Sequence, residues 1–460
     1  TLELYPYKKL FKENLASVMT AHMSIPKIEP NKKLPSSLSK RIVTDLLIDR
    51  MGFKGLIITD GLNMKGAADY STSSEIDLAA ILAGNDLLLI PQDVPATVKL
   101  FKKAIKNKQL TIKRLNHSVR KILMAKYWAG LQNYKPISLV NLHEDLNAKK
   151  DVLLHRELVK KSITVVKNKG DIIPIQNLEK QQIAYVKFGE ATSHSFVTML
   201  KKYAKIDVIS GVDSSDLLSK LKPYNLVVIG YHTSNAHPWK GFKFKKKDIA
   251  TIQKIAKEKK VILDVFSSPY SLLDFKSFKN IEGLVVSFQN SKIAQEISAQ
   301  VLFGAIKANG KLPVSINNEF KEGFGLITST LSRLQYGLPE EVKMSSTKLD
   351  EIDVIANEVL KKKMAPGMQI LVARSGKVVY QKSFGYHTND TLKMVKNSDL
   401  YDVASMTKIL ATLPMVMKAE GEGKFRIATK LKHLLPELRN SNKDTVTLKE
   451  VLSHNGRLKA

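Results

Sequence analysis

Short segments that are apolar on both faces alternate with stretches of helical periodicity along most of this chain. Gly55–Asp60 (GLIITD), Asp86–Pro91 (DLLLIP) and Leu226–Tyr231 (LVVIGY) are clear examples. A strand without a polar face has to be covered on both sides, which is typical of a parallel sheet between layers of helices. The pattern therefore predicts an α/β fold. The content of 43% hydrophobic and 25% charged residues argues against a disordered chain, collagen or a coiled coil.

The pattern changes along the 460 residues, and we expect three domains joined by two linkers. Residues 1–131 hold three strand–helix units, which are too few to close an eight-stranded barrel but fit its last part. Residues 151–318 hold six predicted strands with helices between them, as in a doubly wound sheet, without a G-x-G-x-x-G loop for a dinucleotide. Residues 346–460 begin with a helix and a hairpin that turns at Ser375–Gly376, which predicts the first part of an α+β domain. The expected linkers are residues 132–150 and 319–345.

The chain begins with Thr1 and shows no signal-peptide pattern, so we expect it to be a piece of a longer protein. No apolar run approaches the roughly 18 residues that span a bilayer. Cysteine is absent, which excludes disulfides, thiolate metal sites and a cysteine nucleophile. The ten histidines match no metal-ligand spacing, so neither a metal nor a cofactor is expected.

The formal net charge of +30 is the most unusual number in the composition. Lysine supplies 63 of the 73 basic residues and arginine supplies ten. Because arginine makes the bidentate contacts to bases and phosphates, this balance does not predict a nucleic-acid partner. It predicts either a solvated lysine-rich surface or an anionic partner such as an acidic polymer. The run Phe242–Lys247 (FKFKKK) is interpreted as a solvated edge.

Asp60 is the first candidate catalytic residue. It ends the predicted strand Gly55–Asp60 and is followed by Gly61. Active sites form at the carboxyl ends of parallel strands, both in barrels and in open α/β sheets. A carboxylate held there can be a glycosidase nucleophile, a metal ligand or a helix cap.

The segment around this residue, Phe53–Ala67 (FKGLIITDGLNMKGA), resembles the nucleophile segment of glycoside hydrolase family 3, in its β-N-acetylhexosaminidase branch. In that branch a Met follows the Asp by four residues, as Met64 does here. The resemblance covers about residues 1–320 and implies the last third of a TIM (β/α)₈ barrel followed by an αβα sandwich. The other segments that carry it are 18–26 (VMTAHMSIP), 34–55, 80–91 (AILAGNDLLLIP), 119–131 and 309–316 (NGKLPVSI).

The resemblance implies a retaining glycosidase that removes β-linked N-acetylglucosamine, with muropeptides or other peptidoglycan fragments as the substrate class. Asp60 would attack the anomeric carbon and form a glycosyl-enzyme, which water then hydrolyses. The acid/base of that branch is a His in a Lys-His-x-Pro-Gly motif, which does not occur in this sequence. We therefore expect this fragment to lack its acid/base. A cell-wall substrate fits a periplasmic or secreted location.

Three residues near Asp60 have either a substrate-side or a structural role. His22 ends the preceding strand, where it either lines the pocket floor or packs as a hydrogen-bonded side chain. Met64 is a substrate-binding candidate, and it can equally fill a gap in the core. Asp86 lies at the start of its strand, which is the stability face of a barrel, so we expect a structural role.

Ser405 and Lys408 form an S-x-x-K pattern, which places both side chains one turn apart on one helix face. The Lys can then accept the Ser proton, and backbone N–H groups at the helix start can bind an oxyanion. Pro366–Tyr386 and Leu400–Thr412 (LYDVASMTKILAT) resemble the opening of serine β-lactamase/transpeptidase-type hydrolases, and Val446–Leu458 resembles their next landmark. The resemblance implies that Ser405 and Lys408 are the dyad of a truncated second domain, and we expect them not to act in this fragment.

Two alternatives stay open beside the hexosaminidase. The first is a β-glucosidase or β-xylosidase of the same family, which would take its acid/base from the second domain. The second is a catalytically decayed cell-wall-binding protein or a serine hydrolase. The expected partners are a carbohydrate that contains N-acetylglucosamine and, as a second candidate, an anionic cell-wall polymer, with no nucleic acid and no transmembrane segment.

Overall fold

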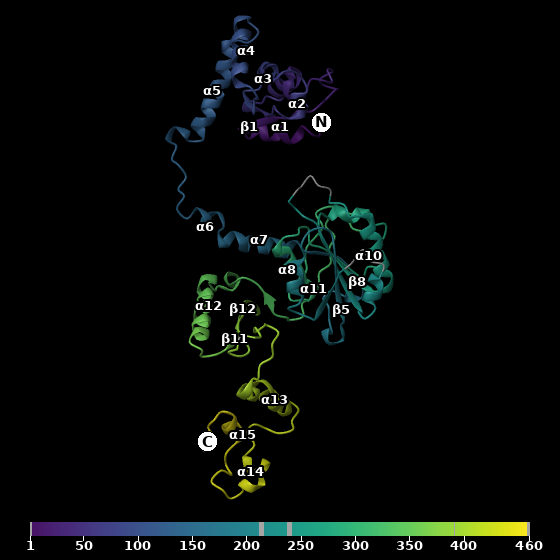
Figure 1. Ribbon diagram of the computed structural model, residues 1–460, viewed down its shortest axis with the longest axis vertical. Coiled ribbons are helices and arrows are strands. Elements are labelled where there is room, and N and C mark those ends of the chain that lie inside the picture. The colour runs from purple at the N-terminus through teal and green to yellow at the C-terminus, as the bar shows by residue number, and fades with distance from the viewer. Residues whose placement is uncertain (1, 211–215, 237–241, 391, 458–460) are drawn as a thin grey trace. The chain divides into compact units, whose positions relative to one another are not determined.

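The computed structural model in Figure 1 describes residues 2–210, 216–236, 242–390 and 392–457 of the chain. Two compact units make up the protein, Thr1–Leu142 and His143–Ala460. Helices alternate with strands through most of both units, and the sheets are parallel or mixed. This confirms the predicted α/β class.

The first unit is built on a three-stranded parallel sheet in the order β1-β2-β3 (Ser17–Thr20, Leu56–Gly61 and Leu87–Leu89). The sheet is open, and Met19 on β1 and Ile90 after β3 are 60% and 51% exposed. The apolar run Ala16–Met23 predicts a strand, and β1 is shorter than this run because it ends before His22, whose ring contacts Ser37 and the Gly61 carbonyl. The helices are α1 (Tyr5–Lys12), α2 (Lys65–Ala68), α3 (Ser73–Ala83), α4 (Val94–Lys106) and α5 (Ile112–Trp128).

The sequence predicts a helix that is capped by Ser36 or Ser37, has apolar residues at Leu38, Ile42 and Leu46, and ends at Gly52. In the structure this helix begins later. Ser36–Leu38 form a single 3₁₀ turn, Ser39 is extended, and Arg41–Arg50 form a helix with π-type hydrogen bonds. Ser39 leaves the helical conformation because its buried hydroxyl donates to Glu29 Oε2 at 2.7 Å. The predicted cap is therefore wrong, whereas the predicted end at Gly52, which has a φ of 72°, is confirmed.

The second unit contains a six-stranded sheet in the order β4-β9-β8-β7-β5-β6. Five neighbouring strands are parallel, and the edge strand β4 is antiparallel to β9. The chain moves outward from β5 to β6 and then returns to β7 on the other side, so the order of strands reverses between β5 and β7. All seven residues of β7 are buried, as its two apolar faces predict. The strands are β4 (Thr164–Asn168), β5 (Ile183–Phe188), β6 (Ile206–Ile209), β7 (Leu226–His232), β8 (Lys260–Phe266) and β9 (Gly283–Val286).

Helices cover both faces of this sheet (Figure 1). One face packs against α7 (Lys149–Ser162), α8 (His194–Leu200) and α11 (Lys292–Leu302), and the other against α9 (Leu217–Leu221) and α10 (Lys246–Glu258). Successive strand residues point to opposite faces, so Val227 belongs to one core and Val228 to the other.

Both predicted linkers contain ordered structure. The helix α6 (Leu142–Leu146) and the start of α7 lie in 132–150. In 319–345, the Leu326 amide donates to the Val165 carbonyl, and Arg333 donates to two backbone carbonyls of the sheet domain. The same segment forms the short strand β10 (Gln335–Tyr336). The Gly, Ser and Thr residues of this segment indicate irregular backbone rather than a free linker, because the segment packs against the sheet domain.

The segment after this strand contains α12 (Ser346–Lys361) and the hairpin of β11 (Gly367–Arg374) and β12 (Lys377–Gly385). The predicted turn is confirmed: Ser375 and Gly376 have φ values of 51° and 73°, as a two-residue hairpin loop requires. β10 pairs in parallel with β12, so the sheet order is β10-β12-β11. The remaining helices are α13 (Leu413–Gly421), α14 (Leu431–Leu434) and α15 (Leu448–Leu452).

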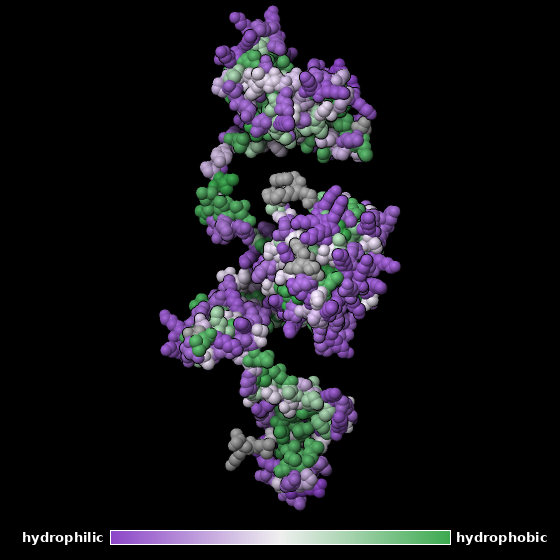
Figure 2. All heavy atoms as spheres, turned by 45° about the vertical axis from the view of Figure 1, so that its right-hand side comes forward, coloured by the Kyte–Doolittle hydropathy of each residue, from purple (hydrophilic) through white to green (hydrophobic). Residues whose placement is uncertain are grey.

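Within the described ranges, no helix combines the length and the apolar character needed to cross a membrane. The same residues contain no cluster of His, Asp or Glu side chains that could hold a metal ion. Hydrophilic side chains cover most of the face of the six-stranded domain that Figure 2 shows. Leu458, the last residue of the segment that resembles a hydrolase landmark, lies outside the described residues.

Candidate active site

Asp60 lies near the carboxyl end of β2, the central strand of the first unit. The flanking residues Thr59 and Gly61 are buried, and Asp60 itself is half-buried. Its Oδ1 atom accepts a hydrogen bond of 2.8 Å from the Gly61 amide. No other hydrogen bond to this carboxylate occurs among the described residues. The strand thus holds a carboxylate in place and leaves one oxygen available to an incoming group.

His22 lies against this strand end. Its Nε2 is 3.0 Å from the Gly61 carbonyl, and its Nδ1 is 2.6 Å from Ser37 Oγ. A carbonyl can only accept, so Nε2 carries the proton, and in the neutral ring Nδ1 accepts from the Ser37 hydroxyl. Of the two roles considered for His22, this geometry supports the hydrogen-bonded, structural one.

Met64 lies on the loop that follows Asp60. Its amide donates to the Gly61 carbonyl at 2.9 Å, which is the carbonyl that His22 also contacts. The Met64 side chain is 50% exposed, so it does not fill a gap in the core. The close approach of this loop depends on Gly66, where a Cβ atom would lie 3.0 Å from both Cβ and O of His22. Asp60, His22 and Met64 are therefore brought together at one end of the sheet.

Asp86 has the structural role that its position predicts. Its side chain is 1% exposed and accepts from the Ile57 amide at 3.1 Å and from Ser118 Oγ at 2.6 Å. The Lys121 ammonium lies 2.7 Å from Oδ2, and Arg114 lies 3.5 Å from Oδ1. The buried Asp86 carboxylate thus connects β2 to α5.

Ser37 and Asn85 contribute to the site, and sequence reasoning missed both. Ser37 is fully buried and orients His22, although its place in the sequence suggests a helix cap. Asn85 is fully buried, accepts from Thr20 Oγ1 at 2.8 Å, and donates to the carbonyls of Ser37 and Ala80. No spacing rule points to such contacts, because they join residues up to 65 positions apart.

Ser405 and Lys408 lie in the second unit. Lys408 Nζ donates to Ser405 Oγ at 3.0 Å, so the pattern forms the contact that it predicts. The surrounding backbone is a 3₁₀ turn (Ala404–Met406) followed by a π-type turn, and regular helix begins only at Leu413. Ser405 and Lys408 are both exposed to solvent.

Two family models match the chain. Residues 1–125 match the glycosyl hydrolase family 3 N-terminal domain, and residues 356–460 match β-lactamase. The chain combines a family 3 glycosyl hydrolase segment with a β-lactamase family segment. These matches confirm both resemblances that the motifs predict.

Known relatives of the family 3 segment are hexosaminidases and related enzymes. The chain is 26% identical over 177 residues to a β-N-acetylglucosaminidase/β-glucosidase of Cellulomonas fimi, which covers 37% of this chain and 31% of that protein. It is 36% identical over 88 residues to a β-hexosaminidase of Chromobacterium violaceum, which covers 19% of this chain and 24% of that protein. The chain therefore spans about a quarter to a third of the length of these relatives.

A solved structure resembles a larger part of the chain. It is a fungal multi-domain family 3 β-N-acetylglucosaminidase, with a TM-score of 0.54 and 25% sequence identity. The likeness covers 70% of this chain and 38% of that one. The α/β fold of the family 3 glycosyl hydrolases thus extends beyond the residues that match the family model.

Proposed function

We propose that this chain carries the nucleophile of a retaining β-N-acetylhexosaminidase that removes N-acetylglucosamine from muropeptides or other peptidoglycan fragments. The observation that carries the proposal is Asp60, a half-buried carboxylate at the end of a central parallel strand in the family 3 segment. One of its oxygens accepts a hydrogen bond from the Gly61 amide, which leaves the other oxygen free to attack the anomeric carbon. Water then hydrolyses the glycosyl-enzyme.

The architecture that accompanies this proposal has three parts. The open sheet β1-β2-β3 is proposed to be the last part of a TIM (β/α)₈ barrel, which fits its parallel order and its exposed edges. The six-stranded domain with helices on both faces is proposed to be the αβα sandwich of family 3. The region after about residue 346 is proposed to be the first part of a serine-hydrolase domain, with Ser405 and Lys408 as its dyad.

We further propose that the proton donor is not one of the described side chains. His22 is the imidazole that contacts this strand end, and both of its ring nitrogens are occupied by Ser37 and the Gly61 carbonyl. A general acid must instead reach the leaving oxygen with a free N–H or O–H group. His22 is therefore assigned to positioning the loop that follows Asp60.

A glycosyl fluoride tests the nucleophile, because fluoride leaves without help from an acid. We expect 5-fluoro-N-acetylglucosaminyl fluoride to add one sugar mass to the peptide that contains Asp60, and Asp60→Asn to remove this adduct. Absence of the adduct from the folded native chain would contradict Asp60 as the nucleophile. An adduct with the matching glucosyl fluoride alone would favour the β-glucosidase alternative.

The same chain should hydrolyse an ordinary alkyl β-N-acetylglucosaminide very slowly. General acid catalysis contributes typically about 10²–10⁴-fold, and an alkoxide leaving group needs that assistance. Turnover of the alkyl glycoside at the rate of a complete hexosaminidase would contradict the missing proton donor, whatever the result with the fluoride.

The charge of +30 supports a second, weaker partner, an anionic cell-wall polymer. We expect the chain to be retained on such a polymer at low ionic strength and released at about 1 M salt, where the Debye length falls to about 3 Å. Retention that is the same at low and high salt would contradict this partner.

A further inference from the structure

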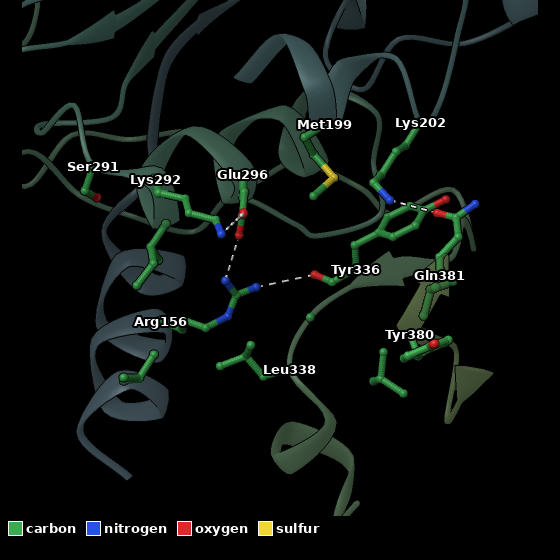
Figure 3. Close-up of a pocket in the computed structure, with 15 residues that line it drawn as sticks. Arg156, Met199, Lys202, Ser291, Lys292, Glu296, Tyr336, Leu338, Tyr380 and Gln381 are labelled. Carbon is green, nitrogen blue, oxygen red and sulfur yellow. Dashed lines mark hydrogen bonds and ion pairs between the residues drawn. The ribbon is translucent and has the colours of Figure 1, made fainter. Parts of the chain in front are cut away.

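A pocket of about 550 Å³ lies in the second unit, where the six-stranded domain meets the hairpin of β11 and β12 (Figure 3). Its walls come from α7, α8, α11 and the segment from Tyr336 to Leu338, together with residues Val378–Gln381 of β12. Pockets of this size accommodate small ligands or a few residues of a peptide. Neither Asp60 nor the pair of Ser405 and Lys408 lines it.

One wall of the pocket is an incompletely paired strand. β12 extends to Gly385, but β10 pairs only with its residues Lys377 and Val378. Among the described strands, none continues along this edge beyond Val378. Val379 has no partner on the other side either, because Val372 pairs with Tyr380 and Ala373 pairs with Val378. The pocket wall thus contains a strand edge of the kind to which an extended peptide can add.

The opposite walls are largely apolar. Val152 of α7, Met199 of α8, Ile293 of α11 and Leu338 line them. Alternate side chains of an extended peptide point to opposite sides, so every second residue could rest on these groups. The flexible Met199 side chain can adapt to different apolar residues.

The charges of the lining are unbalanced. Arg156, Lys202 and Lys292 line the pocket, and Glu296 is the one carboxylate in the lining. Arg156 is engaged: its guanidinium donates to Glu296 at 3.0 Å and to Glu341, outside the lining, at 2.9 Å. The cations that remain for a ligand are therefore Lys202 and Lys292.

Both lysines are placed to meet an anion. The Lys202 ammonium lies 4.3 Å from the centroid of the Tyr336 ring and donates to Gln381 Oε1 at 2.8 Å. No carboxylate of a described residue lies within ion-pair distance of Lys202. Lys292 is 78% exposed and 3.9 Å from Glu296, whose other oxygen already binds Arg156. A ligand that carries carboxylates would compensate this charge.

We propose that this pocket binds a short acidic segment of another protein in an extended conformation. The segment continues the path of β10 along β12 beyond Val378, with apolar side chains against Met199 and Leu338. Its carboxylates approach Lys202 and Lys292. Backbone pairing provides the affinity, and the two lysines select acidic over basic segments. The proposal is independent of the chemistry assigned to Asp60.

The test uses the full chain and the fluorescein-labelled peptide Val-Glu-Val-Glu-Val with blocked ends. We expect fluorescence anisotropy to show binding that weakens with salt. Lys202→Gln combined with Lys292→Gln should weaken it about tenfold, as expected for the loss of two ion pairs near the protein surface. Lys201→Gln, which removes an exposed neighbouring charge outside the pocket, should leave the affinity unchanged. Thermal unfolding of each variant shows whether the fold is retained.

Hydrogen exchange on the same complex locates the peptide. We expect slower exchange of the β12 amides between Val379 and Gln381 in its presence. No binding at 1 mM peptide would overturn the proposal. Equal binding of the Val-Lys-Val-Lys-Val peptide, an unchanged affinity of the double variant, or protection confined to other segments would do the same.

Discussion

Asp264→Asn should make the stability of the six-stranded domain increase with pH between about pH 4 and pH 6.5, where the native protein changes little. Burial raises the pKa of Asp264 from 3.8 to about 7, so the folded state holds a proton that the unfolded state releases. The contribution of Asp264 to stability is therefore complete below pH 3.8 and is lost as the pH rises to about 7. Without this carboxyl group, this loss of stability with rising pH no longer occurs.

His232 has the opposite effect on the pH dependence of stability. Burial lowers its pKa from 6.5 to about 4, so the unfolded state gains a proton that the folded state does not take up. Its contribution to stability is complete above pH 6.5 and is lost as the pH falls to about 4. In the native protein the two slopes oppose each other across this range. Without Asp264, stability should rise by about 3 kcal/mol from pH 4 to pH 6.5, at 1.36 kcal/mol per pKa unit.

The surroundings of the two groups explain their preference for the neutral form. Asp264 is fully buried in β8 and accepts hydrogen bonds from Ser287 Oγ at 2.7 Å and Ser298 Oγ at 2.5 Å, and no cationic side chain among the described residues pairs with it. His232 at the end of β7 is also fully buried, and its ring lies between Tyr185 Oη at 2.8 Å and Asn290 Oδ1 at 2.7 Å. The hydrogen bonds from the two serines favour the charged form of Asp264, and the bond to Asn290 favours the charged form of His232, but burial outweighs them in both cases.

The free energy of unfolding is measured in urea at pH 4, 5.5 and 7. Hydrogen exchange of the β7 and β8 amides is used as the signal, so that the value refers to this domain. His232→Gln is the complementary variant, and its stability should fall by about 4 kcal/mol from pH 4 to pH 7. Asp151→Asn, at an exposed position on α7, serves as the control. A pH profile of Asp264→Asn that matches the native one would contradict the assignment.

Asp86→Ala should unfold the first unit or bring it close to unfolding. Breaking a buried ion pair by removing one partner costs about 3–5 kcal/mol, because the remaining charge is buried without compensation. Here the loss leaves Lys121 and Arg114 of α5 without their carboxylate partner, and the Ile57 amide and the Ser118 hydroxyl lose an acceptor. α5 should then detach from β2.

Limited proteolysis and urea unfolding measure this effect. We expect new cleavage sites between Ile112 and Trp128 in Asp86→Ala, and α10 in the second unit should stay protected. Asp69→Asn, which changes an exposed carboxylate of the same unit, provides the matched control. A loss of less than about 1 kcal/mol in Asp86→Ala, as for an exposed ion pair, would contradict the role assigned to this carboxylate.

The strands of the sheet domain could be predicted closely because their pattern follows from burial alone. The apolar runs predict strands at Ile183–Phe188, Leu226–Tyr231 and Val261–Phe266. β5 has the predicted bounds, and β7 and β8 extend the predicted ranges by one residue. A segment that is apolar on both faces has few alternatives to a covered strand. The hairpin turn at Ser375–Gly376 follows from equally local chemistry, since both residues have positive φ.

Contacts between distant residues could not be predicted in this way. Ser39 interrupts the expected helix because of Glu29, and Ser37 binds His22 although its sequence context suggests a cap. The position of Asp60 at a strand end could be predicted from periodicity, whereas the proposal that it is the nucleophile depends on the family resemblance. The pairing of Asp86 with α5 depends on how the helix packs, which spacing does not encode.

Strand β10 contacts both the hairpin of β11 and β12 and the six-stranded domain. Its backbone pairs with β12, and the Tyr336 ring lies 5.6 Å from that of Tyr203 at the edge of the sheet domain's core. The change in composition near residue 318 therefore does not mark a point at which recombination could replace the C-terminal part without disturbing the sheet domain. A gene fusion made there would lose β10 and uncover Tyr203. A fusion made after Leu338 would keep Tyr203 covered but would remove β12, the pairing partner of β10, and Glu341, which binds Arg156, so neither point divides the second unit into independent parts.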